Sequence, residues 1–357
     1  MTLPRFAAGS PRSPEGPYDA DIVILALDRP SETIAAIRSA LGQTGVSRHV
    51  TIVDQGSRPE NLARLAEVVR GRTDATLLAL DVNHGVAGGR NIGTVFGHGR
   101  IVIGLDNDAE FDSPATAARL TAALDANRTI GAIGCRILVH ATGQDDLTSW
   151  GYPVSLLHHA ADSFDAATFV GAGHAIRRQA WANAGGYDSS LFFCWEEYDF
   201  CLRAIAHGWT IRYRGDIVIR HKVSPERRIA WSGDRWFHFV RNRLYIGRKT
   251  GESWLGLTPR IAGYIVKAAR NGCLGTTPHA IFAAVAMART VTPVPLSAAA
   301  RAYLHRADTT HRGTLLNRLW REVLAALPGH RTAASIRAIT SGEGGPASAA
   351  ATHSASS

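Results

Sequence analysis

Short apolar runs alternate with amphipathic segments over the first half of the chain. The runs at residues 21–27, 50–53, 75–80 and 100–105 predict buried strands. The segments between them repeat an apolar residue every three or four positions, which is the spacing of a helix packed on one face. Strands and helices that alternate in this way are typical of an α/β fold, with a mainly parallel, Rossmann-like sheet and helices on both faces.

The predicted helices also have recognisable starts. Ser31 is a candidate N-cap after the first strand, and Ser113 followed by Pro114 is a candidate after the fourth. The apolar faces comprise Ile34, Ile37 and Leu41 in the first helix and Leu62, Leu65 and Val69 in the second. A last core strand is expected at residues 210–219.

Both ends of the chain lack this periodicity. Residues 1–18 are rich in Pro, Ser, Gly and Arg and predict a flexible arm, and residues 341–357 predict a disordered tail. A length of 357 residues suits one large domain with a helical extension.

Composition and charge narrow the class of protein. Hydrophobic residues make up 45%, which excludes a chain disordered over its whole length. The 39 Lys and Arg against 30 Asp and Glu give a net charge of +9, which favours nucleic acid, an anionic membrane surface or a phosphorylated substrate as partner. The four cysteines form no C-x-x-C pair, and no signal-peptide pattern or apolar run of about 18 residues occurs, so a cytoplasmic protein is expected.

Acidic and amide side chains follow each of the four predicted strands. They are Asp28, Asp54, the pair Asp81 and Asn83, and the triplet Asp106-Asn107-Asp108. The carboxyl ends of parallel strands meet at one edge of a sheet, where open α/β sheets bind ligands. A single Asp after a strand can simply cap the next helix, but four acidic strand ends on one edge favour a binding site.

The Asp-Asn-Asp triplet at residues 106–108 carries two carboxylates one residue apart. In an extended turn such side chains can face one cation. Hard oxygen ligands favour Mg²⁺ or Mn²⁺, with substrate phosphates completing the shell. The triplet therefore predicts a divalent metal site.

A glycine-rich segment, NHGVAGGRNIG at residues 83–93, predicts the start of a helix. Such a start lets backbone N–H groups approach a phosphate or a sugar. Arg90 and Asn91 are expected in the first turn, facing the same sheet edge. Since no G-x-G-x-x-G pattern follows the first strand, a dinucleotide-binding fold is not favoured.

Residues 192–203, FFCWEEYDFCLR, place three carboxylates beside aromatic rings. Partial desolvation raises the pKa of a carboxyl group and favours general-base chemistry. Helical spacing puts Glu196, Asp199 and Arg203 on one face and turns Glu197 away from them. Asp199 and Arg203 are expected to form a structural ion pair, which leaves Glu197 as the candidate base.

Six motifs in order make the chain similar to a known family. They are VDQGS, NHGVAGGRNIG, DND, GAGHAIRR with GGYD, FFCWEEYDFCLR and IRHKVS. On this set the chain resembles the family 2 nucleotide-sugar glycosyltransferases of GT-A fold over about residues 20–250. The resemblance implies a catalytic domain at residues 19–250, with a nucleotide-sugar half at 19–110 and an acceptor half at 111–250, followed by a helical extension at 251–340.

The resemblance also implies roles for single residues. Asp54 would contact the nucleotide base and Asp106 the nucleoside. Asp108 would be the principal ligand of Mg²⁺ or Mn²⁺, with Asp106 and His221 beside it. The donor-binding set would comprise Asp28, Asp54, Asn83, Gly85, Gly88, Arg90, Asn91, Asp106 and Asn107.

The acid pair Glu196-Glu197 occupies the family's Glu-Asp position, whose second member is the usual base. This chain departs from the family there, because Glu197 stands in place of Asp. The expected reaction is an inverting, metal-dependent transfer of a sugar from a nucleotide diphosphate to a hydroxyl or amine of a glycan, lipid-linked or natural-product acceptor. Two alternatives stay open: a nucleotidyltransferase of sugar phosphates, and a catalytically silent binding protein with a GT-A-like fold.

Aromatic and basic residues interleave over residues 231–243. We interpret them as part of an acceptor site, formed by Trp195, Trp231, Trp236 and Arg241, rather than as a nucleic-acid surface. The alternative is a core helix with a basic face.

A helix predicted at residues 258–270 has Ile261, Tyr264, Ile265 and Ala268 on one face. This face either packs on the core or lies on the inner surface of an anionic membrane, and packing is the commoner outcome.

Overall fold

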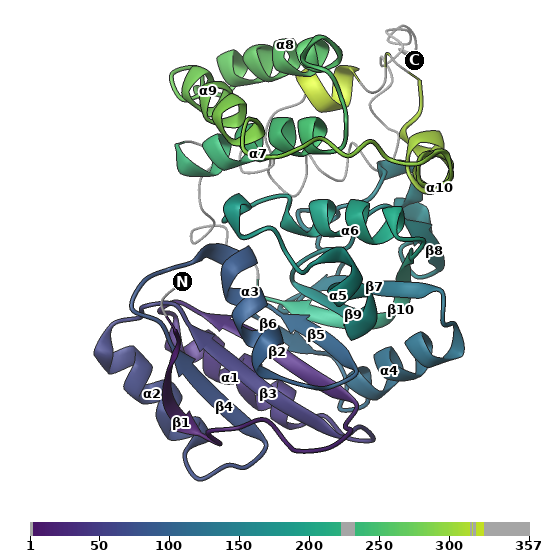
Figure 1. The fold of residues 1–357 in the computed structure, drawn as a ribbon. Helices are drawn as coiled ribbons and strands as arrows, with labels where there is room; N and C mark the ends of the chain where they lie inside the picture. The colour runs from purple at the N-terminus through teal and green to yellow at the C-terminus, as the bar shows by residue number, and fades with distance from the viewer. Residues whose placement is uncertain (1–2, 223–232, 315, 317–318, 325–357) are drawn as a thin grey trace, which may run out of the picture.

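The computed structural model describes residues 3–222, 233–314, 316 and 319–324, with a mixed sheet at the centre (Figure 1). The strand order is β1-β4-β3-β2-β5-β9-β7-β10-β6, and β8 pairs with β10. The strands are β1 (Arg5–Gly9), β2 (Ala20–Ala26), β3 (Arg48–Asp54), β4 (Ala75–Ala79), β5 (Ile101–Leu105), β6 (Ala109–Phe111), β7 (Ile130–Val139), β8 (Ser163–Ala166), β9 (Gly173–Arg177) and β10 (Thr210–His221).

The two halves of the sheet differ in strand direction. β4, β3, β2 and β5 run parallel, as the alternating pattern predicts, so their carboxyl ends share one edge. β9 lies antiparallel between β5 and β7, and β10 runs parallel to β7 and antiparallel to β6. The α/β class is confirmed, and the sheet becomes mixed beyond β5.

Helices cover both faces of the sheet. One face carries α1 (Pro30–Leu41), α2 (Pro59–Val69) and α4 (Thr116–Ala126), and the other carries α3 (Gly85–Phe96), α5 (Arg178–Ala184) and α6 (Glu196–Ala206). Each face has its own buried cluster, with Ile37 and Leu120 in the first and Phe200 and Ile205 in the second. Because both faces are covered, the carboxyl edge of the strands is the part of the sheet that a ligand can reach.

The C-terminal helices form a further layer beyond α6 (Figure 1). They are α7 (Asp234–Lys249), α8 (Trp254–Arg270), α9 (Thr277–Ala288) and α10 (Ala298–Ala307); short 3₁₀ turns lie at Val154–His159, Ser189–Leu191 and Thr309–Arg312, and a π-helical turn at Leu319–Leu324. Trp236 and Val240 of α7 pack with Leu257 of α8 and Ala280 of α9. Although the sequence assigns α7 to the catalytic domain, the helix shares its core with the extension.

The apolar face of α8 packs against α7 and α9. Ala268 is buried there, and Ile261 and Tyr264 are partly buried in the same cluster, whereas Ile265 is 44% exposed. Most of the apolar face of α8 is therefore packed against α7 and α9, and contact of this helix with a membrane stays a prediction. Within the described ranges, every helix is too short or too polar to cross a bilayer.

The beginning of the chain differs from the prediction. Far from being a flexible arm throughout, it forms β1, which pairs antiparallel with β4 and covers what would otherwise be an open sheet edge. α1 begins at Pro30, one residue before the predicted cap Ser31, because proline lacks the N–H that would be unpaired at that position. α4 begins at Thr116, after Ser113 and Pro114. The predicted tail at residues 341–357 lies outside the described residues.

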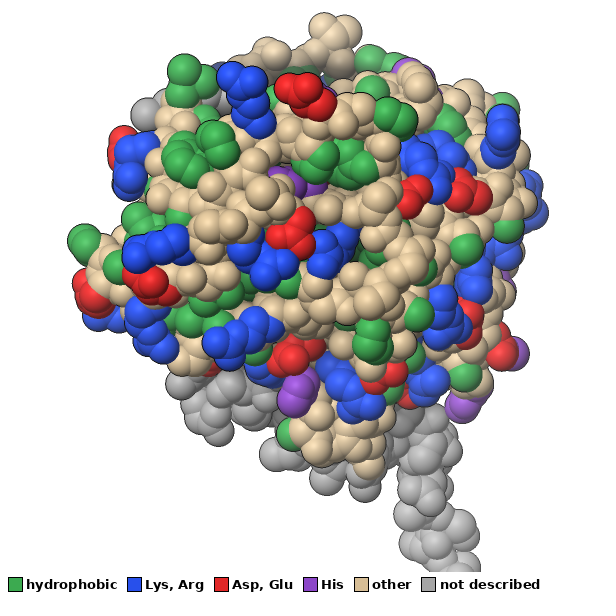
Figure 2. Space-filling view, turned by 90° about the horizontal axis from the view of Figure 1, so that it is seen from below, with side chains coloured by type: hydrophobic (Ala, Val, Ile, Leu, Met, Phe, Trp, Pro, Cys, Tyr) green, Lys and Arg blue, Asp and Glu red, His purple; other side chains and the backbone are tan. Residues whose placement is uncertain are grey.

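Charges of both signs are mixed on the face that Figure 2 shows. Lys and Arg side chains alternate there with Asp and Glu rather than gather in one patch. The described residues on this face therefore form no single basic patch. The four cysteines are free thiols, and three of them are buried.

Candidate active site

A small polar cluster lies just beyond the carboxyl end of β5. Asp106 and Asp108 follow this strand directly, and β10 ends at His221 beside them. Asp108 Oδ1 lies 3.3 Å from His221 Nε2, and Asp108 Oδ2 lies 3.2 Å from the guanidinium of Arg29. His221 Nδ1 makes a 2.9 Å hydrogen bond with Asp146. The structure thus joins Asp108 to His221 and adds Arg29 and Asp146, which sequence analysis missed because neither lies in a recognisable motif.

Charge holds this cluster together. Burial alone would lower the pKa of His221, but hydrogen bonds to Asp108 and Asp146 outweigh burial and raise that pKa to about 10. Burial would raise the pKa of Asp108, but the His221 hydrogen bond and the charge of Arg29 outweigh it and lower that pKa. Without a metal ion, Asp108 is therefore an ionised carboxylate between two cationic side chains at neutral pH. A metal that binds His221 Nε2 would replace the proton on that nitrogen.

Arg90 lies beneath this edge rather than on it. Its side chain is 3% exposed, and it donates to the carbonyls of Val23 and Gly171 and, at 2.7 Å, to Asp106 Oδ1. Gly104 makes room for it, since a Cβ there would lie 2.8 Å from the guanidinium. The structure therefore differs from the predicted diphosphate contact. Because its N–H groups already bind buried oxygens, Arg90 fixes Asp106 instead.

The glycine-rich segment allows α3 to pack closely on its neighbours. Gly85 has a φ of +73°, and a Cβ there would lie 2.2 Å from the carbonyl oxygen of Phe192; at Gly88 it would lie 2.9 Å from a side chain of the preceding turn. Asn91 lies in the second turn of α3, not the first as predicted. It donates to the carbonyl of Tyr187 at 2.7 Å and accepts from its N–H at 2.9 Å, so it points away from the strand edge.

Three other predicted donor residues hold backbone groups or helix starts. Asp28 accepts from the N–H of Arg58, where α2 begins, at 3.1 Å. Asn83 accepts from the N–H of Gly85 at 2.7 Å, and Asn107 donates to a hydroxyl of α1 at 3.4 Å. Asp28 therefore holds the start of α2 and does not cap α1, the helix that follows its strand.

Asp54, at the end of β3, is 1% exposed. Its Oδ2 accepts from the N–H groups of Gly56 and Ser57, at 3.2 and 3.1 Å. Its Oδ1 has no hydrogen-bond partner among the described residues. Burial is the main cause that raises the pKa of Asp54 above its ordinary value. A buried oxygen without a donor is costly, so this atom is suited to accept a hydrogen bond from a ligand.

The acid pair stands in the first turn of α6. Glu196 is 3% exposed, whereas Glu197 is partly exposed. A Cβ on Gly171 would lie 2.3 Å from Glu197 Oε1, so this carboxylate lies against Gly171, whose carbonyl accepts from Arg90. Burial raises the pKa of Glu197 to about 7; burial and then the charge of Glu197 raise the pKa of Glu196 well above its ordinary value. Gly171 and Arg90 therefore connect the acid pair to Asp106.

The backbone that leads into α6, residues 191–195, is strained, and we name it the acid-pair loop. Phe192, Cys194 and Trp195 have φ values of 62°, 69° and 72°. For residues with a side chain, this left-handed region costs about 1–3 kcal/mol each and persists only where surrounding contacts enforce it. An N–H of α3 donates to the carbonyl of Phe192 at 2.7 Å, and Asn242 of α7 donates to three further carbonyls of the loop. Two helices thus hold the loop: α3, which precedes it in the sequence, and α7, which follows it.

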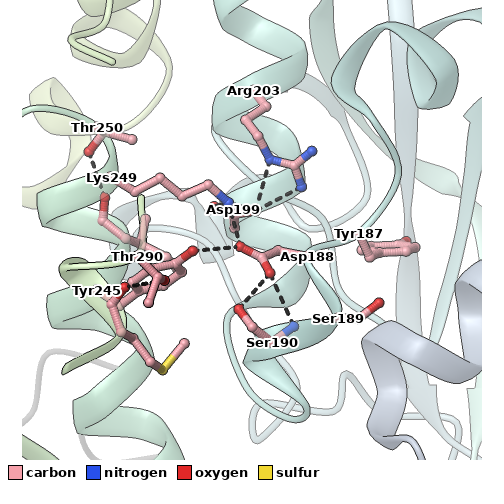
Figure 3. Close-up of polar contacts among 12 residues, drawn as sticks. Tyr187, Asp188, Ser189, Ser190, Asp199, Arg203, Tyr245, Lys249, Thr250 and Thr290 are labelled. Atoms are coloured by element: carbon pink, nitrogen blue, oxygen red, sulfur yellow. Dashed lines mark hydrogen bonds and ion pairs between the residues drawn. The ribbon is translucent and has the colours of Figure 1, made fainter. Parts of the chain in front are cut away.

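A buried ion network joins α6 to α7 (Figure 3). Asp199 forms the expected ion pair with Arg203, with Oδ2 2.7 Å from Nη2, and a second pair with Lys249 at 2.9 Å. Lys249 also lies 2.7 Å from Asp188, which accepts from Tyr245 at 3.0 Å. The predicted structural role of the Asp199–Arg203 pair is confirmed, and these contacts fix α6 to the C-terminal layer.

The predicted acceptor residues have different surroundings. Trp236 is fully buried among α7, α8 and α9 and donates to Thr277 at 2.9 Å; because it cannot stack on a ligand there, this prediction is wrong. Arg241 donates to a carbonyl of the acid-pair loop at 2.9 Å. Trp195 is partly buried beside the acid pair, and Trp231 lies outside the described residues.

Whether these residues fit a divalent metal depends on what completes its shell. In the part of the chain that the structure describes, no group of three or more His, Cys, Asp or Glu side chains is placed to hold an ion. Asp108 and His221 do lie close together. His221 is hydrogen-bonded to the carboxylate of Asp146, and such a carboxylate typically orients a metal-binding imidazole. Mg²⁺ and Mn²⁺ often take one or two protein ligands and complete their shell with phosphates. The residues fit a cation that is shared with a phosphorylated substrate.

The acidic strand edge beside a mixed second half defines a GT-A type of fold. Among solved structures, GalNAc-T7 with UDP, GalNAc and Mn²⁺ matches with a TM-score of 0.55 at 14% identity, over 89% of this chain and 60% of that chain. This likeness shows the fold.

Two family models match the sequence. Glycosyl transferase family 2 matches residues 21–182, and glycosyl transferase family group 2 matches residues 116–293. The chain belongs to the family 2 glycosyltransferases.

Two curated relatives match parts of the chain. Succinoglycan biosynthesis protein ExoO of Rhizobium meliloti (strain 1021) is 37% identical over 90 residues, 25% of each chain. O-antigen biosynthesis protein RfbC of Myxococcus xanthus is 24% identical over 257 residues, covering 66% of this chain and 20% of that protein. The chain spans a quarter or less of the length of these relatives.

Proposed function

We propose that this glycosyltransferase moves a sugar from a nucleotide-diphosphate donor to a hydroxyl or amine of an acceptor, with inversion and with a divalent metal. The observation that carries the proposal is one continuous site, in which Arg90 contacts both Asp106 and the carbonyl of Gly171 beneath Glu197. The similar fold that binds UDP, GalNAc and Mn²⁺ supports the choice of donor and metal.

The strand edge supplies the donor site. Asp54 Oδ1 is an acceptor for an N–H of the nucleotide base, and Asp106, fixed by Arg90, faces the nucleoside end. Asp108 and His221 would hold Mg²⁺ or Mn²⁺, which when bound offsets the charge that develops on the leaving diphosphate. Asp146 keeps the imidazole of His221 in the orientation that ligation needs.

The acid pair supplies the base. Glu197 accepts the proton of the acceptor hydroxyl or amine while the acceptor atom bonds to the anomeric carbon and the bond to the diphosphate oxygen breaks. A single displacement of this kind inverts the anomeric centre. Burial brings the pKa of Glu197 to about 7, close to the working pH at which a general base is most effective. Glu196, which is more deeply buried, is the less accessible of the two carboxylates.

The family assignment favours glycosyl transfer over nucleotidyl transfer. Two other possibilities, a catalytically silent binding protein and a retaining glycosyltransferase, can be distinguished from the proposed inverting enzyme by the reaction that each catalyses. The silent protein would turn over no donor, and the retaining enzyme would not need Glu197 as base.

The proposal is tested by hydrolysis of a panel of UDP-, GDP- and TDP-sugars without acceptor, with Mn²⁺ or with EDTA. We expect hydrolysis of at least one donor with Mn²⁺ and none with EDTA. NMR of the released sugar should show the anomer opposite to that of the donor. Turnover in EDTA would exclude the metal role, and release of the same anomer would exclude inversion.

A further inference from the structure

We propose that Asn242, on α7 of the C-terminal layer, is a positioning residue that holds the acid-pair loop in the conformation that presents Glu197. The inference rests on the proposed function, in which Glu197 is the base. It assigns to a helix beyond the strand edge a direct part in the geometry of the reaction site.

The contacts of the Asn242 amide nitrogen all converge on this loop. The side chain is fully buried, and Nδ2 lies 2.8 Å from each of the carbonyl oxygens of Leu191, Phe193 and Cys194. Oδ1 accepts from Arg241 Nε at 2.8 Å, which fixes the amide with its nitrogen toward the carbonyls. The two N–H groups of one amide therefore lie among three backbone acceptors of the loop, so at least one N–H is shared between two carbonyls.

The loop's own backbone supplies a donor to Leu191, whose carbonyl accepts from the N–H of Phe193 at 2.7 Å, whereas the carbonyls of Phe193 and Cys194 accept from Asn242. The carbonyls of the loop come before the first turn of α6, and the left-handed residues Phe192, Cys194 and Trp195 turn successive peptide groups in different directions. Buried carbonyls without a donor are costly, so loss of the amide favours a relaxed loop. Since Glu196 and Glu197 follow directly, a relaxed loop displaces the first turn of α6 and the carboxylate with it.

The other side of the loop is fixed by α3. The carbonyl of Phe192 accepts an N–H of α3 at 2.7 Å, and Gly85 leaves no room for a side chain between them. Arg241 adds bonds to the carbonyls of Ser190 and Leu191. Because α3 fixes the carbonyl of Phe192, the carbonyls of Phe193 and Cys194 are the part of the loop that Asn242 positions.

The test compares Asn242→Leu, which keeps the volume and removes the donor, with Thr277→Val. The control removes the buried partner of Trp236 in the same layer and leaves the acid-pair loop untouched. The substrate is the UDP- or GDP-sugar that the wild type hydrolyses. We expect Asn242→Leu to lower kcat for this hydrolysis by about 10–100-fold, the effect of misplacing a catalytic group by about 1 Å. The Kd for UDP with Mn²⁺ should change by less than about twofold, because the strand edge is untouched. Thr277→Val should lower only Tm.

A second readout needs no turnover. The charged groups that face Glu197 are its neighbour Glu196, Asp106 beyond β5 and Arg90 of α3. In the wild-type background, Glu197→Gln should raise Tm more at pH 8 than at pH 5, since this partly buried carboxylate is largely ionised only at the higher pH. In the Asn242→Leu background this difference should shrink by at least about half, because a displaced Glu197 becomes hydrated.

The outcomes separate this inference from the proposed function. An Asn242→Leu protein that loses only Tm, with kcat and the pH-dependent Tm difference unchanged, overturns the positioning role and leaves the function intact. Full activity of Glu197→Gln would exclude Glu197 as the base of the proposed function, and the Tm comparison then decides alone whether Asn242 positions this carboxylate. If Asn242→Leu fails to fold, Asn242→Ser, which keeps one donor, should show the same changes at reduced size; wild-type values of both readouts in Asn242→Ser would overturn the inference.

Discussion

The strand edge and the acid-pair loop contribute to one site, but their residues are placed in different ways. Asp54 ends β3 and Asp106 directly follows β5, so these parallel strands place the backbone that carries each carboxylate, and Arg90 then holds the side chain of Asp106. Glu197 follows a strained loop whose shape depends on α3 before it and on Asn242 after it. The comparison teaches that the backbone of the donor side is placed by the strands that it ends, whereas the backbone of the catalytic side is held by side chains and N–H groups from distant parts of the chain.

The largest effect should come from the catalytic side. Glu197→Gln removes the basic oxygen and nearly keeps the volume, so kcat should fall about 10²–10⁴-fold while donor affinity is retained. The wild-type rate should rise with pH through about 7 as the Glu197 carboxylate ionises, and this rise should vanish in the variant. Kinetics across pH 5 to 9 check both. Glu67→Gln, on the exposed face of α2, is the matched control, and an active Glu197→Gln would move the base to another carboxylate.

On the donor side, Asp146→Asn should weaken the metal response. Loss of the carboxylate that orients His221 should lower Mn²⁺ affinity or Mn²⁺-dependent turnover about 10–100-fold. The neighbouring Asp145, which pairs with Arg136 at 2.7 Å, gives the control Asp145→Asn. Mn²⁺ titrations of both variants by activity and by thermal shift make the measurement. Equal titrations would contradict a metal role for His221.

The next largest effect should be on the free energy of unfolding, and it should come from the acid pair rather than from the strand edge. A carboxyl whose pKa is raised on folding binds its proton more tightly in the folded state, so its contribution to stability is lost as pH rises through the folded value. For Glu197, with a pKa near 7, the wild type should lose up to about 3 kcal/mol relative to Glu197→Gln between pH 5 and pH 8. Denaturant unfolding at the two pH values measures it. An unchanged difference would mean that this carboxylate is well hydrated.

The smallest effect is expected from Trp236. Trp236→Phe removes its hydrogen bond to Thr277 in the C-terminal layer, which should cost about 1 kcal/mol of stability and leave turnover unchanged. Thermal unfolding and donor hydrolysis of the same preparation test this. A selective loss of turnover would return Trp236 to the acceptor site that its sequence suggested.

The features that sequence could predict are those with a local cause. The four parallel strands and their acidic ends follow from apolar runs and from the polar residues after them, and the ion pair of Asp199 with Arg203 follows from helical spacing. β1 was missed because an edge strand of small residues has no apolar pattern of its own. Trp236 was misplaced because composition does not tell which face of α7 is buried.

The long-range contacts leave no local signal. Asn242 lies in a helix, where asparagine usually has no special meaning, and its three carbonyl partners lie about 50 positions earlier in the chain. Arg90 looked like a phosphate ligand because sequence shows its charge and not its burial. Such roles become visible only when the backbone brings distant segments together.

The close contact between Gly171 and Glu197 has an evolutionary consequence. Since a Cβ at position 171 would lie 2.3 Å from the Glu197 carboxylate, the two positions share one limited space. A relative with the shorter aspartate in place of Glu197 leaves about one methylene of that space unfilled, so we expect it to tolerate alanine in place of Gly171. The two positions should then change together among relatives, and the size of the residue at 171 would indicate the length of the base that each relative uses.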